Sequence, residues 1–140
     1  MGKRGILILL VVGIGAVIGW RFISPGQDVA TPGTGAPIAE VDVPALSAAE
    51  SAGKSAYDAN CAACHGANAA GQDGVAPPLV HVIYEPSHHA DAAFFRAARN
   101  GVRAHHWPFG DMPRIDGIAE EDLAGIVTYI RALQRANGIE

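Results

Sequence analysis

The sequence predicts an all-α domain of about three to four helices over residues 47–140. A capping-box pattern, Ser47–Glu50, opens an Ala-rich helix that runs toward Asn60. Apolar residues recur at helical spacing between Ile118 and Ala136, which indicates a long last helix. No segment shows a convincing pattern for a β-strand. The recurring residues of the last helix are Leu123, Ile126, Val127, Ile130 and Leu133.

A shorter helix and the ends of the last helix can also be read from local signals. The shorter helix covers roughly Asp91 to Asn100, and Gly101 is its C-terminal stop. The last helix is started by Asp116 or, less conventionally, by Ala119, and a glycine lies near its end.

Residues 1–23 differ in composition from the rest of the chain. Lys3 and Arg4 precede a charge-free run from Gly5 to Trp20. A helix over residues 5–23 would be about 28 Å long, close to the hydrocarbon thickness of a bilayer. We therefore expect an uncleaved transmembrane anchor with its basic end in the cytoplasm and the rest of the chain exported. A cleaved signal peptide is the alternative, although no Ala-x-Ala signal follows closely.

Residues 24–46 form the expected linker. This stretch is rich in Pro, Gly, Ala and Thr and has few large apolar side chains with which to fold. The predicted organisation is therefore an anchor at 1–23, a flexible linker at 24–46 and a folded domain at 47–140.

The segment Cys61-Ala62-Ala63-Cys64-His65 carries the most specific chemistry in the chain. Its spacing is typical of c-type haem attachment, in which two thiols form thioethers to the porphyrin and the histidine binds the iron. Half of a zinc site or a redox dithiol is the alternative. The chain has no other cysteine, and no strand-helix-strand pattern lies beside the motif.

Met112 is the candidate for the sixth iron ligand. Met1 is the initiator, so Met112 offers the one thioether in the body of the chain. Gly110 permits an unusual backbone angle before it, and Pro113 stiffens the chain after it. A histidine and a thioether are a common ligand pair for haem iron in electron carriers. The alternative is that Met112 only fills space in the core.

Together these residues resemble the class I cytochrome c family over approximately Ser47 to Ala136. The resemblance implies a class I cytochrome c fold around one covalently attached haem c, in which the last helix crosses the first. Gly53 and Tyr57 match the small and aromatic positions of the first helix, and Tyr129 matches the aromatic position of the last. We expect Gly53 to receive the Tyr129 side of the last helix.

The resemblance also implies three further haem neighbours. The carbonyl of Pro77 is expected to accept the second N–H of the His65 ring, with Leu79 against the porphyrin. A plain proline-rich turn is the alternative. Trp107 is expected either to donate its indole N–H to a haem propionate or to pack beside the porphyrin.

The remaining histidines depart from the common pattern of this family. One of them could replace Met112 and give bis-histidine iron, or the adjacent pairs could bind copper or zinc. Adjacent residues of a helix or strand rarely both point at one ion, so surface or loop histidines are the simpler interpretation. These residues are His81, His88, His89, His105 and His106.

The function implied is that of a membrane-tethered, periplasmic monohaem electron carrier rather than an enzyme. It would sit in a bacterial cytoplasmic membrane with its haem domain in the periplasm. Its expected partners are a cytochrome bc complex, a terminal oxidase, or a periplasmic dehydrogenase or reductase. From Ser47 onward, seven Lys and Arg face eleven Asp and Glu, a formal charge of minus four that argues against nucleic-acid binding. The alternatives are a haem enzyme or a gas or redox sensor with a labile Met ligand, or a His-rich metal-binding module.

Overall fold

The computed structural model describes residues 35–140. The predicted anchor and the first part of the predicted linker lie outside these residues. No helix between residues 35 and 140 combines the length and the apolar character needed to cross a membrane.

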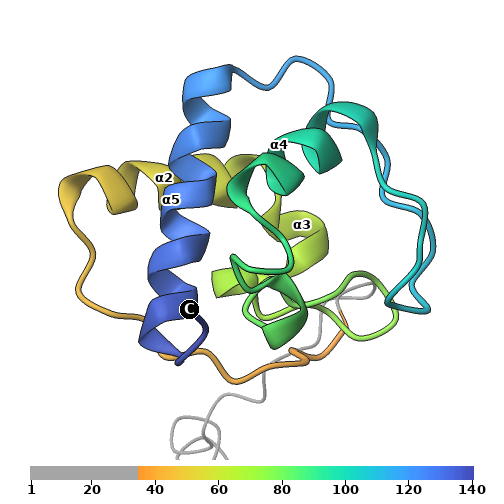
Figure 1. Ribbon diagram of the computed structural model, residues 1–140, viewed down its shortest axis with the longest axis horizontal. Coiled ribbons are helices and arrows are strands. Elements are labelled where there is room, and N and C mark those ends of the chain that lie inside the picture. The colour runs from red at the N-terminus through yellow and green to blue at the C-terminus, as the bar shows by residue number, and fades with distance from the viewer. Residues whose placement is uncertain (1–34) are drawn as a thin grey trace, which may run out of the picture. The chain divides into compact units, whose positions relative to one another are not determined.

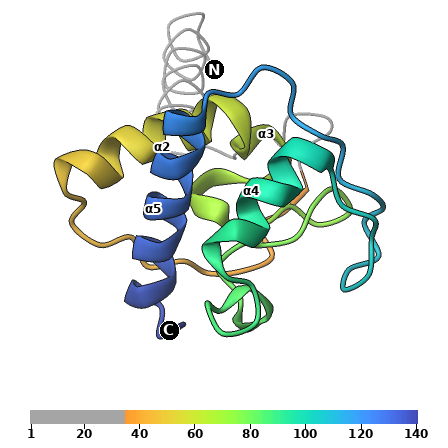
Figure 2. The same ribbon diagram turned by 45° about the horizontal axis from the view of Figure 1, so that its top comes forward.

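The described part of the chain is helical, as predicted. It contains no strand, and its ladder-type pairing is limited to two isolated antiparallel pairs, Gln72 with Ala76 and Val102 with Met112. Helices α2 and α5 cross, and α4 lies beside α5 (Figures 1 and 2). In chain order the elements are α2 (Ala48–Asn60), α3 (Ala62–His65), the 3-10 turns Ala67–Ala69 and Val82–Tyr84, α4 (Asp91–Asn100) and α5 (Glu120–Ala136).

The helix ends follow the local signals in the sequence, with one correction. The Ser47 hydroxyl accepts a hydrogen bond from the Glu50 amide at 3.3 Å, and the Glu50 carboxylate accepts one from the Ser47 amide at 2.8 Å. Gly101 follows α4 at a φ of 73°. The N-cap of α5 is Ala119, so the preference for Asp116 was wrong. The first turn of α5 carries three acidic residues, and their negative charges interact favourably with the positive N-terminal end of the helix dipole.

The crossing of α2 and α5 depends on two glycines. A Cβ added to Gly53 would lie 2.0 Å from the carbonyl oxygen of Gly125 and 3.2 Å from the Cβ of Tyr129. Tyr129 does pack at this crossing, as expected, and its ring centroid is 5.5 Å from that of Tyr57. The backbone of Gly53 comes closest to Gly125, however, a residue that the sequence analysis did not single out. Only residues without a side chain allow the two backbones to come so near.

Residues 35–46 differ from the expected flexible linker. The amides of Ile38 and Ala39 donate to the carbonyl of Ala70 at 3.1 and 2.9 Å. The Asp42 amide donates to the Asn137 side chain at 3.0 Å, and the Asn137 side chain donates back to the Asp42 carbonyl at 2.9 Å. This stretch lies along the domain because its backbone polar groups find partners there. These residues therefore bond to the domain that follows them.

Candidate functional site

The attachment segment, residues 61–72, begins where α2 ends. The Cys61 amide still donates to the carbonyl of Tyr57 at 2.8 Å, and the amides of Cys64 and His65 donate to the carbonyl of Cys61 at 3.1 and 2.9 Å. One helical turn therefore carries both cysteines and the histidine. Cys61 is half-buried, Cys64 is exposed and His65 is buried. The two thiols are free, so both sulfurs are available for thioether formation.

His65 is oriented by the backbone of the proline-rich loop. Its Nδ1 lies 2.9 Å from the carbonyl oxygen of Pro77, the contact that the resemblance implied. Because a carbonyl oxygen only accepts, Nδ1 carries the proton and Nε2 keeps its lone pair for a metal. Burial lowers the pKa of His65, and the hydrogen bond to Pro77 partly opposes that change. A neutral imidazole of fixed orientation results.

Gln72 holds the attachment segment from inside the domain. Its side-chain amide nitrogen donates to the carbonyls of Ala62, Ala63 and Cys64 at 3.3, 2.9 and 3.0 Å. The Ala62 carbonyl also accepts from the Gly66 amide at 3.0 Å, but no further helical turn follows to supply donors to the carbonyls of Ala63 and Cys64. Gln72 is buried at 6 % exposure, so the amide replaces water that cannot reach this place. No sequence signal marked this residue in advance.

Two tyrosines hold the residues that follow His65, one through the backbone and the other through a side chain. The Tyr57 hydroxyl donates to the carbonyl of Gly66 at 2.8 Å, and the Tyr129 hydroxyl donates to the side-chain oxygen of Asn68 at 3.1 Å. The sequence analysis assigned both tyrosines to the aromatic positions of the two crossing helices, and both are fully buried in the core. Their hydroxyl groups add a polar function that the packing argument did not include.

Leu79 lies in the buried core, next to the loop that contains Pro77. Its amide donates to the carbonyl of Ala69 at 2.9 Å, and its carbonyl accepts from the Gln134 side chain at 2.8 Å. Its side chain belongs to the same buried cluster as Tyr57 and Ile130. The loop is thereby joined both to the attachment segment and to α5.

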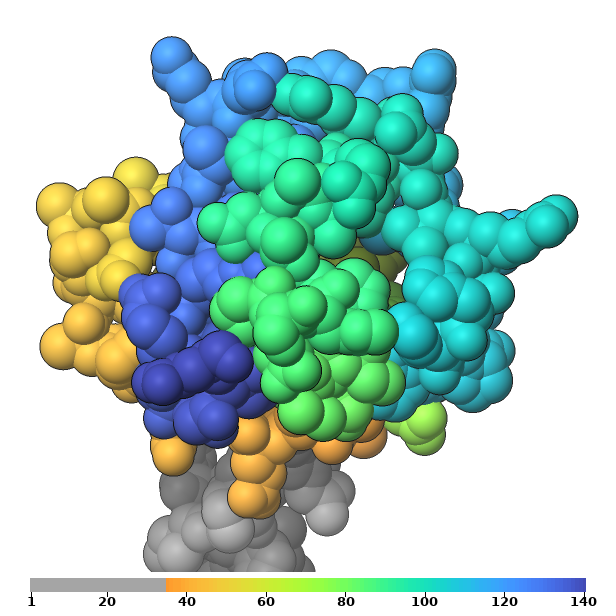
Figure 3. Space-filling model, in the orientation of Figure 1, coloured from red at the N-terminus to blue at the C-terminus, as the bar shows by residue number. Residues whose placement is uncertain are grey.

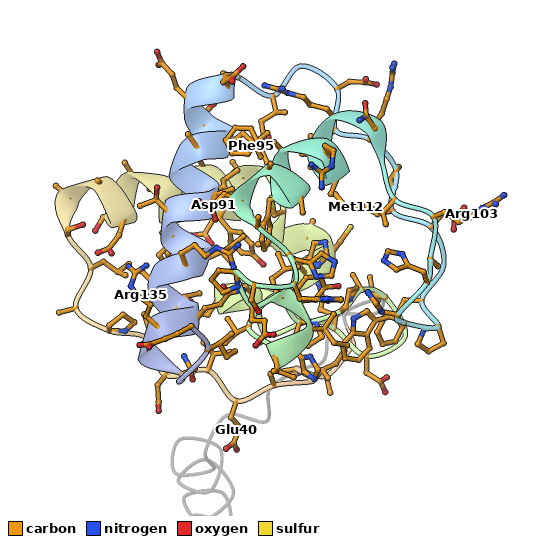
Figure 4. All side chains as sticks on the ribbon, in the orientation of Figure 1. Glu40, Asp91, Phe95, Arg103, Met112 and Arg135 are labelled. Carbon is orange, nitrogen blue, oxygen red and sulfur yellow. The ribbon has the colours of Figure 1, made fainter. Side chains whose placement is uncertain are left out.

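Met112 lies on the methionine loop, residues 101–119, between α4 and α5. Its amide and carbonyl pair with the carbonyl and amide of Val102, both at 2.9 Å. A Cβ on Gly101 would come within 2.6 Å of the Met112 carbonyl oxygen, so the glycine admits this pairing. In Figure 4, Met112 lies on the inner side of the loop while Arg103 extends outward. The Met112 side chain is partly buried.

The order of these features along the chain agrees with a known protein family. Residues 50–134, more than half of the chain, match the family model Cytochrome c. The chain belongs to the cytochrome c family. No match was found among curated proteins. Membership implies covalently attached haem c and a role in haem-based electron transfer, and Cys61 and Cys64 with His65 fit the attachment motif of these cytochromes.

The cysteines of this cytochrome do not fit the two alternative interpretations of the motif. Burial, and to a lesser extent the neighbouring Cys64, raises the pKa of Cys61 to about 11. A redox dithiol requires a lowered thiol pKa, because the thiolate is the reactive form. The group of potential metal ligands found within residues 35–140 contains no cysteine, so a zinc site built on this motif lacks its remaining ligands.

Trp107 provides an independent test of whether a haem fits. Its indole N–H is buried and makes no hydrogen bond of ordinary geometry among the described residues, although the Tyr84 hydroxyl lies near enough for the indole to lower the pKa of Tyr84 slightly, against the larger effect of burial. Its ring is stacked on Phe109, with centroids 5.9 Å apart, and meets the His81 ring edge-on at 5.1 Å. A buried donor of this kind requires an acceptor, and a haem propionate is one. The surface is hollowed between the segments coloured green and teal, with olive residues near position 60 visible on its floor (Figure 3).

The remaining histidines are distributed over two loops of the cytochrome. His81 caps the 3-10 turn Val82–Tyr84, its Nδ1 accepting from the Ile83 amide at 3.2 Å. Nδ1 of His105 lies 2.8 Å from the carbonyl oxygen of Arg103, two residues earlier in the chain. The other three, His88, His89 and His106, gather into one group. Partial desolvation, followed by the charges of the surrounding imidazoles, lowers the pKa of His106.

Proposed function

We propose that this cytochrome is a membrane-tethered, periplasmic carrier of single electrons whose iron is ligated by His65 and Met112. The observation that carries the proposal is the hydrogen bond between Nδ1 of His65 and the Pro77 carbonyl. It leaves Nε2 directed away from that loop, with its lone pair free. The bound haem would supply the redox centre, which gains or loses one electron.

The residues around His65 would keep its position constant while the charge of the site changes. Gln72 and Tyr57 fix the backbone on either side of the ring, and both are buried. Little movement of the ligand means little reorganisation during transfer. This suits electron transfer better than the binding and release of substrates.

Met112 would complete the iron ligands from the opposite loop. A thioether raises the reduction potential relative to a second imidazole. The backbone pair with Val102 sets the position of Met112, and Pro113 restricts the chain that leaves it. Trp107 would donate its N–H to a propionate, and Leu79 would pack against the porphyrin.

Tethering and location rest on the sequence pattern of residues 1–23. The basic start and the apolar run support an anchor in a bacterial cytoplasmic membrane, with the haem domain on the periplasmic side. An anchor of this kind would keep the carrier concentrated near membrane partners. A cytochrome bc complex and a terminal oxidase, or a periplasmic dehydrogenase or reductase, are the proposed donors and acceptors.

The test is a spectrum and a redox titration of the full-length chain, produced in a host that exports proteins and attaches haem c. We expect one reversible one-electron transition, a far-red sulfur-to-iron band in the ferric protein, and no carbon monoxide binding by the ferrous protein. Met112→Ala should abolish the band, whereas Val102→Ala, which leaves the backbone pair intact, should retain it. High-spin iron in the unaltered protein would refute the proposed ligand pair.

A second candidate function is favoured by the position of Met112 on a mostly exposed loop. In a gas or redox sensor, this ligand would leave and open a coordination position. Rapid carbon monoxide binding to the ferrous, unaltered protein would support the sensor over the carrier.

A further inference from the structure

Three histidines outside the proposed haem ligands lie close enough to share one metal ion. The ligand nitrogens of His88, His89 and His106 all lie within 4.8 Å of one another. The three rings meet in pairs, with centroids 4.7 Å apart for His88 and His89, 5.6 Å for His88 and His106, and 5.5 Å for His89 and His106. His88 and His106 are exposed and His89 is half-buried, so an ion could enter from solvent.

The backbone explains how two adjacent histidines reach the same place. His88 and His89 end a turn in which both amides donate to the carbonyl of Glu85, at 3.1 and 2.7 Å. In a strand or helix, neighbouring side chains diverge, which is why the sequence disfavoured a shared ion. A turn removes that restriction, so the sequence argument does not apply to this pair.

His89 has the hydrogen bond expected of a metal-binding histidine. Its Nδ1 lies 2.6 Å from the carbonyl oxygen of Ile83. The carbonyl can only accept, so Nδ1 carries the proton and Nε2 is free to bind an ion. The carbonyl of His89 accepts from the buried guanidinium of Arg131, whose Nε donates to Asp91 at 2.7 Å. The turn is therefore fixed before any ion arrives.

His106 comes from a different part of the chain, the methionine loop. Three nitrogens around a tetrahedral zinc ion are about 3.3 Å apart, given metal–nitrogen distances of about 2.0–2.1 Å. The nitrogens lie at most 4.8 Å apart, and rotation of the exposed side chains of His88 and His106 toward the His89 ring can close them to this spacing. His105 is adjacent, but its Nδ1 is directed at the Arg103 carbonyl and it does not belong to the group.

We propose that His88, His89 and His106 form a binding site for a divalent first-row transition ion of the zinc or copper(II) type, with water as the remaining ligand. Three neutral imidazoles and no carboxylate select such ions over magnesium or calcium. The ion would fasten the methionine loop to the turn that precedes α4. It would therefore stabilise the loop that carries Met112, six residues after His106.

The test uses the full-length, haem-loaded chain without a histidine tag, stripped of metals and equilibrated with zinc alone. Zinc is redox-inactive, so the oxidation state of the haem does not change during the measurement. We expect one zinc per chain by elemental mass spectrometry. We expect His88→Ala and His106→Ala each to weaken binding by at least about tenfold, because even residues that only orient a metal ligand contribute that much.

His105→Ala is the matched control, since it removes an exposed imidazole next to the site. It should retain stoichiometric zinc, and zinc should raise the unfolding temperature of this variant and of the unaltered protein but not that of His106→Ala. An unchanged haem spectrum in all three variants would show that the haem site remains intact. Absence of stoichiometric zinc in the unaltered protein, equal binding by all the variants, or loss of binding in His105→Ala would each overturn the proposed site.

Discussion

The attachment segment and the methionine loop are built differently, although each carries one proposed iron ligand. Buried side chains hold the attachment segment: Tyr57, Gln72 and Tyr129 each direct a polar group at its backbone or at a side chain within it. The described bonds that hold the methionine loop are mainly backbone bonds, such as the pair between Val102 and Met112 and the bond from the Ile115 amide to the Ala98 carbonyl. Inside it, the Ala104 amide donates to the exposed carboxylate of Asp111 at 2.8 Å.

The two kinds of support indicate which region of the cytochrome is rigid and which can open. Bonds to buried groups are costly to break because the freed partners cannot reach water, whereas exposed groups exchange one partner for another. We therefore expect the attachment segment around His65 to keep its geometry until the whole domain unfolds. The methionine loop around Met112 should open locally before that.

The largest effect should follow from removing the covalent attachment. In the double variant Cys61→Ser, Cys64→Ser the haem would lose both thioethers, and a core of this size depends on the haem as packing material. We expect a chain without added haem mass and with most of its helical signal lost, measured by mass spectrometry and circular dichroism. A compact, cooperatively unfolding domain without haem would show that the attachment segment is held by its protein contacts alone.

Alkaline pH should have the next largest effect on the free energy of unfolding, mainly through the tyrosines that support the attachment segment. Burial raises the pKa of Tyr57 far above its usual range and that of Tyr129 to about 12, and it also raises the pKa of Tyr84. The folded state thus holds these phenolic protons more tightly than the unfolded chain. The stabilisation is complete below pH of about 10 and is lost as pH rises above that value.

Phenolate absorbance and the free energy of unfolding, followed together against pH, would check this expectation. Both should remain level up to pH of about 10. Phenolate should then appear in step with unfolding. Ionisation of a tyrosine near its ordinary pKa in the folded protein would contradict the burial argument.

A smaller effect is expected from a matched pair of single variants, one in the attachment segment and one in the methionine loop. Gln72→Leu removes the side-chain donor that the part-buried carbonyls of Ala62, Ala63 and Cys64 share, and should lower the free energy of unfolding by about 1–3 kcal/mol. Asp111→Ala removes an exposed acceptor from the methionine loop and should change that free energy by no more than about 0.5 kcal/mol. Chemical denaturation of both haem-loaded variants measures the difference. Equal losses would mean that the two sides are held equally well.

The sequence predicted those parts of the fold that depend on short-range rules. The capping box at Ser47, the range Asp91–Asn100 and the glycine stop after it each follow from a few neighbouring residues. The contact between His65 and Pro77 came from the resemblance to a family, because the two lie twelve positions apart in the sequence and no local pattern joins them.

What the sequence missed depends on contacts between distant segments. Gly125 meets Gly53 only because α2 and α5 cross at that point. Gln72 is an ordinary polar residue until the turn at its side places three carbonyls around its amide. Composition suggested a flexible linker at residues 24–46. Within residues 35–46, however, backbone groups bond to partners on the domain, and composition does not show where such partners lie.

The most direct test is a gentle denaturant titration of the ferric, full-length cytochrome, followed at once by the far-red sulfur-to-iron band and by the helical circular dichroism signal. If Met112 binds the iron from the more weakly held loop, the band will be present at the start and will disappear at a lower denaturant concentration than the helices. A band that is absent from the start, or one that disappears together with the helices, would contradict this account.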